Sequence, residues 1–347
     1  MRWCWLAMAS TACSFQGAAV IDASGTGDGR ASDAPASAGN ARKITFLDQA
    51  STAPLIDFPV LIRLDPATID YATIANPRTD LAFADPDATP LPFDIDTWTP
   101  GGESDVWVKV PKIDASSTDF ITLHFGAGVQ GRFDPAAVWS TYAYVVHLGS
   151  QLTSSIATTA QASSMNVGTG AGLVGEASTF AGTGPETIDL GGDTGPLFNA
   201  WDKFTLELWV YPDYTAAPTG EPAILGKGSV VSNGRLITQG SDLQIDFAFQ
   251  AGTKFLHAPV TWKHWNQLVY TYDGAAFALY HDGAAVISNA ITGSLPNSGL
   301  AMVLGGASPL TGAIDELRVA HAGRSADWIR AEYLAATRQF TTIAVLP

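Results

Sequence analysis

The aspartate and glutamate residues are the first candidates for catalysis in this sequence, and their spacing shows whether they can act in pairs. Hydrolysis of a glycosidic bond needs two carboxylates about 5–10 Å apart, one as acid and the other as base or nucleophile. No two glutamates are four residues apart, the spacing that would set a pair on one face of a strand with a third carboxylate between them. Asp94 and Asp96 would share a strand face, but beside a turn. Glycoside hydrolysis is therefore the least favoured of the functions considered.

Other catalytic patterns are missing from the sequence. The six histidines are scattered without a paired metal spacing, and no Gly-x-Ser-x-Gly motif occurs. Gly226-Lys227-Gly228 follows a strand-like run but lacks the remaining residues of a phosphate-binding loop. We therefore predict that the protein is not an enzyme.

Aromatic residues near turns are the best candidates for ligand contact. Flat rings can stack on the C–H faces of sugars, and the chain has ten tryptophans. The aromatic residues that lie near predicted turns are Trp98, Trp201, Trp262 and Tyr214. One interpretation is a stacking platform for a carbohydrate. The other is that these residues pack in a core or at a domain interface.

The strands that would position these residues are organised around Trp262–Gly283. Alternating hydrophobic residues from Trp265 to Tyr272 predict a strand with one buried face. Asp273-Gly274 predicts a hairpin turn, and Asp282-Gly283 ends the return strand. Upstream, residues 204–211 alternate with their even-numbered side chains on one face and their odd-numbered ones on the other.

An ordered set of motifs in the second half of the chain resembles a known family. The runs FTLELWVYP, ILGKG, WNQLVYTYDG, LYHDG, LGG and GAIDELRV together are similar to a laminin-G-like jelly roll of the concanavalin A type, over roughly residues 143–334. The resemblance implies two packed antiparallel sheets that bind sugars or proteins, often with one calcium ion.

The same resemblance implies where calcium would bind. In related jelly rolls an aspartate of the last long strand, here Asp315, meets backbone carbonyls of the first strand, here Phe180–Gly184, with Gly182 as the assigned ligand. Calcium takes several oxygen ligands, including backbone carbonyls. The alternative is that Asp315 forms hydrogen bonds with a neighbouring loop or caps a turn.

The first half of the chain predicts a second β-sandwich. Short strand-like runs alternate with Pro, Gly and Asp turns from residue 41 to 135. The runs DFPVLI, DLAF, LPFDIDTW and VWVKVP resemble the bacterial family called domain of unknown function 2341, over residues 42–132. That family has no established activity and commonly precedes a laminin-G-like jelly roll.

We therefore predict an all-β protein with two β-sandwich domains, residues 41–135 and 136–347, the second a concanavalin A-like jelly roll. Within the second domain, residues 151–172 are predicted to form a long surface loop. Ser325 is predicted to cap a short C-terminal helix, and residues 339–345 are predicted to form a last strand.

The N-terminus resembles a bacterial lipoprotein signal. Arg2 precedes a short apolar run, residues 3–9, and small residues precede Cys13. The resemblance implies removal of residues 1–12, a lipid anchor on Cys13, and direction to the outer membrane by Ser14. Residues 13–40, rich in Ala, Gly, Ser and Asp, predict a flexible linker. The alternative is an exported or cytosolic N-terminus with an incidental cysteine.

The net charge and the cysteine content limit the classes of partner that the protein can bind. A net charge of −15 gives no electrostatic footprint for nucleic acid or anionic lipid. The only cysteines, Cys4 and Cys13, leave the folded part without a disulfide. We predict an exported, non-catalytic surface protein that binds a glycan. A protein–protein interaction or adhesion role in a surface assembly is the alternative.

Overall fold

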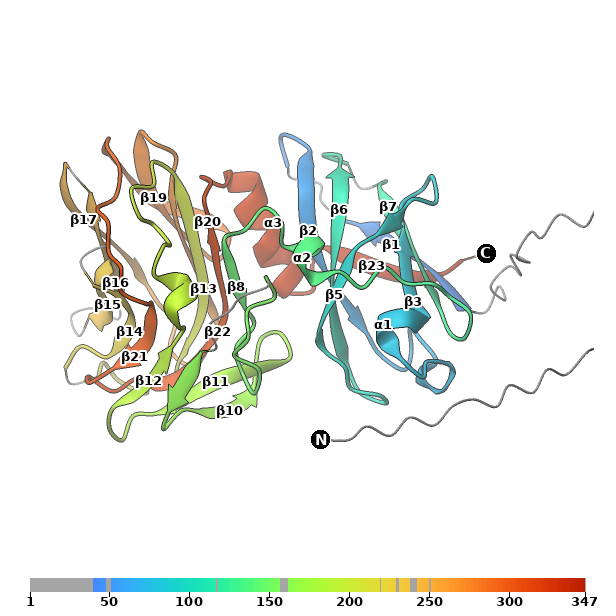
Figure 1. Ribbon diagram of the computed structural model, residues 1–347, viewed down its shortest axis with the longest axis horizontal. Helices are drawn as coiled ribbons and strands as arrows, with labels where there is room; N and C mark the ends of the chain where they lie inside the picture. Colours follow the sequence, from blue (N-terminus) through green and yellow to red (C-terminus); the bar gives the residue numbers. More distant parts are fainter. Residues whose placement is uncertain are drawn as a thin grey trace, which may run out of the picture. The chain divides into compact units, whose positions relative to one another are not determined.

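The computed structural model describes residues 40–346 apart from 48–50, 117, 157–161, 219, 229–230, 238–241 and 250. Nearly all elements are β-strands, and they form two sandwiches (Figure 1), so the all-β prediction is confirmed. No helix of the described part is long and apolar enough to cross a bilayer. The predicted signal, the predicted linker up to residue 39, and the lipidation site Cys13 lie outside the described residues.

The first sandwich packs a five-stranded sheet against a three-stranded one. The five-stranded sheet contains, in spatial order, β23 (Thr341–Val345), β1 (Ala41–Phe46), β7 (Phe120–Phe125), β3 (Leu81–Ala84) and β4 (Pro90–Leu91). The three-stranded sheet contains β2 (Leu55–Leu64), β6 (Ser104–Ile113) and β5 (Phe93–Thr97). Alternating apolar residues from both sheets form one core, in which the cross-strand pair Ile44 and Ile121 is fully buried.

The second sandwich is a jelly roll of two larger sheets. The eight-stranded sheet contains β10 (Gly168–Ala171), β11 (Glu176–Ala181), β22 (Thr311–Ala320), β13 (Phe204–Pro212), β18 (Asn266–Tyr272), β19 (Ala276–His281) and β20 (Ala284–Ala290), with β8 (Tyr144–Val146) paired to β22. The seven-stranded sheet contains β17 (Gly252–Pro259), β16 (Asp242–Phe249), β15 (Val231–Ile237), β14 (Ala223–Lys227), β21 (Val303–Gly306), β12 (Glu186–Asp189) and β9 (Ser163–Met165).

The strands predicted from alternation are present. Phe204, Leu206, Leu208 and Val210 share one face of β13, as predicted, and they belong to the jelly-roll core. Asp273-Gly274 joins β18 to β19 and Asp282-Gly283 joins β19 to β20, with positive φ at both glycines. However, β18 is buried at every residue, because its outer face is covered as well.

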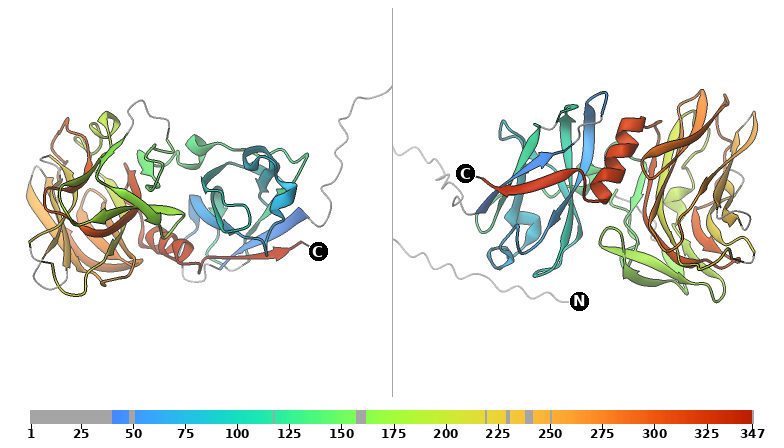
Figure 2. Two further views of the ribbon diagram at one scale, coloured as in Figure 1. Left: turned by 90° about the horizontal axis from the view of Figure 1, so that it is seen from below. Right: turned by 180° about the vertical axis from the view of Figure 1, so that it is seen from behind.

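The C-terminal segment returns to the first sandwich. Ser325 caps helix α3 (Ala326–Ala336) by accepting a hydrogen bond from the backbone of Trp328, as predicted. Helix α3 contacts β2 of the first sandwich and β20 of the jelly roll. The predicted last strand, β23, pairs with β1 at the edge of the first sandwich (Figure 2).

Two predictions about domain organisation differ from the structure. Residues 136–347 were expected to form the jelly roll, but β23 completes the first sandwich instead, because Phe340 packs with Phe46 and Phe58. The predicted long loop at 151–172 contains strands β9 and β10, which extend the edges of the two jelly-roll sheets. The remaining helices are short: α1 (Pro77–Asp80) and α2 (Pro135–Val138).

Candidate functional site

The four predicted aromatic residues do not form one platform. All four are partly buried, and they occupy three separate places. Trp98 packs on Tyr71 of the first sandwich, with ring centroids 5.0 Å apart. Trp201 stacks on His321, with centroids 4.2 Å apart. Only Trp262 and Tyr214 are neighbours, in an edge contact at 5.6 Å that packs against the jelly-roll core.

A pocket next to that pair offers a different aromatic surface. It has a volume of about 400 Å³ and lies on the outer face of the eight-stranded sheet. Tyr211 at the end of β13 and Trp265 before β18 form its aromatic wall, with ring centroids 5.6 Å apart and planes inclined at 60°. Both side chains are partly exposed. Ligand pockets in proteins typically measure about 300–1,000 Å³.

Small residues on neighbouring strands keep the Tyr211 ring open. Tyr211 pairs with Ala313 of β22, which in turn pairs with Thr179 of β11, so these three side chains lie in one row on the outer face. Gly312 adjoins them with a φ of +150°, and a Cβ atom there would collide with the carbonyl oxygen of Tyr211. No larger side chain can therefore stand at this point of the floor.

The rim of the pocket supplies polar groups. The Asp213 carboxylate lies 3.4 Å from the Lys263 ammonium, and both side chains are about half exposed. Thr311 lines the pocket, and its backbone N–H donates to the Tyr214 hydroxyl at 2.8 Å. Trp262 and Tyr214 therefore support the rim from behind. Aromatic faces next to a carboxylate and hydroxyl groups match a ligand with alternating C–H and O–H surfaces.

Sequence reasoning missed Tyr211 and Trp265. The alternation of residues 204–211 puts Tyr211 on the face of the odd-numbered side chains, and Trp265 begins the alternating run that predicts a strand with one buried face. The missing information was that Gly312 and Ala313 stand beside Tyr211, which depends on the pairing of β13 with β22. The small-residue run Thr311-Gly312-Ala313, opposite an aromatic strand end, is the signal that could have found them.

The predicted calcium ligands are not brought together. Asp315 accepts hydrogen bonds from the backbone N–H groups of Leu173 and Val174, at 2.8 and 3.1 Å, which is the alternative that the sequence left open. Ala181 pairs with Thr311, which is four residues along β22 from Asp315, and Gly182 lies one residue further away. Its N–H donates to the Glu186 carboxylate.

A second polar site lies further along the same face of β13 and β22, where the first sandwich covers it. The Arg318 guanidinium lies over the Trp107 ring of β6, at 4.3 Å from the ring centroid. It forms ion pairs with Glu316, Glu207 and Glu332. All of these charged side chains are almost completely buried.

A β-bulge explains why two consecutive acids face this site. The pairing of β13 with β22 shifts register between Glu207 and Trp209, and Glu316 has a φ of +51°. The extra residue interrupts the alternation of β22, so Asp315 and Glu316 both point to the outer face. Strict alternation would have sent one of them into the core.

His147, just after β8, is the centre of this covered site. Its Nδ1 lies 2.7 Å from Glu316 Oε1 and 3.6 Å from Asp96 Oδ2, and its Nε2 lies 3.6 Å from Asp94 Oδ2. Asp94 and Asp96 do share a face of β5, as the sequence indicated, and that face meets the jelly roll. Burial would lower the pKa of His147, but Glu316 and Asp96 outweigh it and hold the pKa well above its usual value.

The carboxyl groups of the covered site have displaced pKa values. Burial raises the pKa of Asp96 to about 8, although His147 opposes the shift. Burial likewise raises the pKa of Glu207 to about 8, with Glu332 adding to it and Arg318 opposing it. The pKa of Asp315 is raised well above its usual value, mainly by burial and then by Glu316. The cations of the covered site therefore do not fully offset the desolvation of these three acids.

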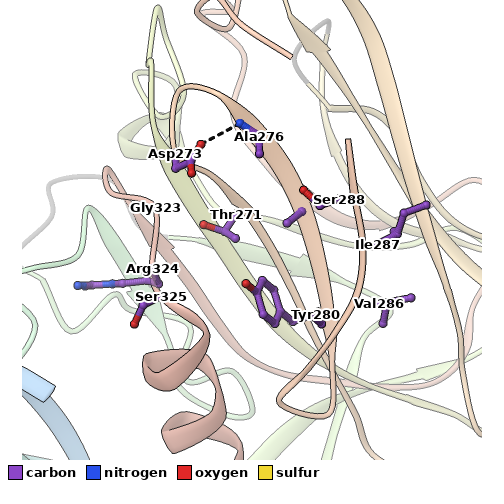
Figure 3. Close-up of a pocket in the computed structure, with 12 residues that line it drawn as sticks. Thr271, Asp273, Ala276, Tyr280, Val286, Ile287, Ser288, Gly323, Arg324 and Ser325 are labelled. Carbon is purple, nitrogen blue, oxygen red and sulfur yellow. Dashed lines mark hydrogen bonds between the residues drawn. The ribbon is translucent and has the colours of Figure 1, made fainter. Parts of the chain in front are cut away.

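A third pocket, of about 510 Å³, lies between β18–β20 and the start of α3 (Figure 3). Its charged groups already have partners within the protein. Asp273 accepts from the N–H groups of Ala275 and Ala276 in the hairpin turn. Arg324 points away from the strands and donates to Thr141. This pocket is consequently a weaker candidate for a polar ligand than the one at Tyr211.

Comparison with protein families agrees with both resemblances. Residues 187–330 match the family described as "Concanavalin A-like lectin/glucanases superfamily". Residues 78–144 match the domain of unknown function DUF2341. The order of the two families is as predicted, and the first match identifies the second sandwich as a concanavalin A-like jelly roll. No curated protein is similar enough in sequence to count as a relative.

Several solved structures resemble part of the chain. Domain 4 of AbnA, an extracellular GH43 arabinanase from Geobacillus stearothermophilus solved with arabinotriose, has 18% identity and a TM-score of 0.43, covering 54% of this chain and 96% of that one. The binding domain of Paraclostridial Mosquitocidal Protein 1 has 12% identity and a TM-score of 0.45, covering 56% and 52%. The botulinum neurotoxin serotype G binding domain has 14% identity and a TM-score of 0.46, covering 55% and 50%. The chain thus spans about half of each toxin domain, and TM-scores below 0.5 support no functional conclusion.

Proposed function

We propose that this protein is a non-catalytic binding protein whose jelly roll recognises a carbohydrate in the pocket at Tyr211 and Trp265. The observation that carries the proposal is an aromatic pair beside the small residues Gly312 and Ala313. A sugar ring could stack on Tyr211 while its hydroxyl groups reach Asp213 on the rim. The match of residues 187–330 to a superfamily of lectins and glucanases supports this choice of ligand class.

The composition of the pocket favours binding over hydrolysis. Among the described residues that line it, Asp213 is the single carboxylate. Glycoside hydrolysis generally needs two carboxylates on opposite sides of the scissile bond. Glu207, Asp315 and Glu316 of the covered site lie on the same sheet, but on the part that the first sandwich covers. A bound glycan would therefore leave the pocket unchanged.

A glycan-array screen of the full chain, with and without calcium, tests the proposal. We expect binding to a defined glycan, followed by at least a tenfold loss of affinity in Trp265→Ala, equal to about 1.4 kcal/mol. Trp201→Ala is the matched control, because Trp201 is a partly exposed aromatic residue elsewhere on the jelly roll. Equal losses of affinity in both variants would contradict the proposal, and so would the absence of any glycan binding with and without calcium. If binding requires calcium, the predicted calcium ion would be supported, with ligands other than Gly182.

A protein partner is the second candidate, and strand β20 favours it. This strand ends the eight-stranded sheet, and Val286 and Ile287 are 44% and 41% exposed (Figure 3). An exposed apolar edge strand is a template for an added strand from another chain. Affinity capture from cell envelopes would detect such a partner. Val286→Lys should abolish the capture, whereas Trp265→Ala should not.

The location is part of the same proposal. An exported protein anchored by a lipid on Cys13, in the outer membrane or facing outward from the cell, would present the jelly roll to external glycans. Cys13→Ser should move the protein from the membrane fraction to the soluble fraction after cell lysis. An unchanged membrane fraction would remove the anchor from the proposal without affecting the glycan pocket.

A further inference from the structure

The covered site contains three side chains from both sandwiches that converge on one point. Asp96 comes from β5 of the first sandwich, His147 follows β8, and Glu316 comes from β22 of the jelly roll. One ligand atom of each residue lies within 4.8 Å of the other two. The point adjoins a cavity of about 320 Å³ that Asp96 and His147 help to line.

Each of the three side chains is held by one atom and leaves another atom for the shared point. Glu316 Oε2 accepts from Arg318, which leaves Oε1 beside His147 Nδ1. Asp96 Oδ1 accepts from the Thr97 hydroxyl at 3.2 Å. Its Oδ2 forms no hydrogen bond with the part of the chain that the structure describes, although the side chain is 94% buried. A buried carboxylate oxygen without a donor is costly unless a cation neutralises it.

A carboxylate also faces the second ring nitrogen of His147. Its Nε2 faces Asp94 Oδ2 at 3.6 Å, and the same oxygen accepts from the Trp139 indole at 2.9 Å. At this distance the Asp94 carboxylate acts on Nε2 through its charge and not through a hydrogen bond, and it favours the Nε2-protonated tautomer that a metal ligand at Nδ1 needs. A metal ion would displace the proton that Nδ1 shares with Glu316, so that Nε2 keeps its proton and Nδ1 presents its lone pair to the shared point.

The surrounding charge favours a cation. Among the described residues, buried or nearly buried acidic side chains outnumber the basic side chains around them. The acids are Asp94, Asp96, Asp105, Glu207, Asp315, Glu316 and Glu332, and the bases are Arg63, His147 and Arg318. Asp315 Oδ1, next to Glu316 in sequence, is a further buried oxygen without a hydrogen bond to the described part of the chain. A divalent ion would offset this excess.

The geometry points to a binding site for one divalent transition-metal ion of the Zn²⁺ class, held by Asp96, His147 and Glu316 at the contact between the two sandwiches. One imidazole nitrogen with two carboxylate oxygens suits Zn²⁺, whereas Ca²⁺ prefers oxygen ligands alone. A fourth position would face the cavity and take water. Since the ligands come from both sandwiches, the ion would join them. The site is separate from the calcium site predicted at Asp315 and Gly182, and from the glycan pocket.

Titration of the EDTA-treated full chain with ZnCl₂, and separately with CaCl₂, tests the site. We expect one Zn²⁺ per chain and a rise in the thermal midpoint of at least about 3 °C at saturating zinc, because the ion binds only the folded state. Asp96→Asn should weaken zinc binding at least tenfold. Asp94→Asn should weaken it roughly tenfold to a hundredfold through the histidine. Asp87→Asn, at an exposed turn, is the matched control and should bind as the wild type does.

Binding of Co²⁺ to the wild type is a second test that does not depend on the folding of any variant. Trp107 and Trp139 lie 6.2 and 5.5 Å from the His147 ring, so Co²⁺ at this site should quench tryptophan fluorescence in the wild type without a thiolate-to-cobalt band. Three results would overturn the inference: no zinc bound by the wild type, stabilisation by Ca²⁺ but not Zn²⁺, or unchanged affinity in folded Asp96→Asn. In the first case Asp96 and Glu316 would instead share a proton.

Discussion

Strands β13 and β22 present one continuous outer face, yet its two ends have opposite surroundings. At one end Tyr211 and Gly312 face solvent and line a pocket. At the other end Glu207 and Arg318 are sealed beneath Trp107 of the first sandwich. The strands are the same, so the covering sandwich decides what each end can do. The open end can bind a ligand reversibly, whereas the covered end joins two parts of the chain.

The largest effect should come from removing the central cation of the covered end. Arg318→Met leaves Glu316, Glu207 and Glu332 buried without their shared partner, and we expect a loss of about 3–5 kcal/mol in the free energy of unfolding. Urea denaturation measures it. Arg330→Met, on the exposed side of α3, is the control, with an expected change of about 0.5 kcal/mol or less. Equal effects would mean that the covered end contributes no more to stability than an ordinary surface.

The acidity of the covered end predicts a dependence on pH. The pKa of Glu207 is about 8 when folded and near 4.5 when unfolded, so the folded state holds a proton that the unfolded state releases between these values. Stability from this group is therefore greatest below pH 4.5 and falls as pH rises toward 8, by up to about 1.4 kcal/mol per pH unit. Glu207→Gln should flatten the stability profile in that window while keeping an acceptor for the Gln267 amide. An unchanged slope would contradict the displaced pKa, and Glu221→Gln serves as the control.

A smaller effect should follow from loosening the helix that helps to cover the sheet. The Ser325 hydroxyl caps α3, and Trp328 of that helix packs edge-on against Phe58, with ring centroids 4.9 Å apart. Ser325→Ala should lower the free energy of unfolding by about 1 kcal/mol. Ser288→Ala, at an exposed position of β20, should change it little. If the two variants have the same free energy of unfolding, the Ser325 cap does not stabilise the packing of α3 over the sheet.

The open end should tolerate change with the smallest cost in stability. Asp213→Asn removes a half-exposed ion pair with Lys263, which contributes about 0.5 kcal/mol or less. The same substitution should weaken glycan binding measurably, because an amide is a poorer acceptor than a carboxylate. If Asp213→Asn lowered stability without weakening glycan binding, the open end would act as a structural region and not as a binding site. Thermal unfolding and calorimetric titration on the same preparation distinguish these outcomes.

Much of the fold could be predicted from the sequence because local patterns specify it. Alternation predicted the core side of β13, Asp-Gly pairs predicted the two turns around β19, and Ser325 predicted the start of α3. These signals depend on residues only a few positions apart. They agree with the structure because the local preferences and the tertiary packing favour the same elements.

The sites could not be predicted in the same way, since they depend on pairings between distant segments. Asp96 meets Glu316 only because one sandwich packs on the other, and no pattern near either residue records that contact. The bulge at Glu316 reverses the side to which the following residues point. A prediction from strict two-residue alternation cannot anticipate such an inserted residue. Tyr211 likewise became a candidate only once Gly312 was placed beside it.

The pairing of β23 with β1 also bears on the order in which the chain can fold. β1 leaves a ribosome or an export channel before β23, with the whole jelly roll between them. Until β23 has emerged, β1 has one neighbour among the described strands, β7, and an open edge on its other side. A fragment that stops after residue 135 would keep that open edge and lack Phe340 from its core. The first sandwich is therefore completed only after the jelly roll has been synthesised, and any truncation within the jelly roll damages both sandwiches at once.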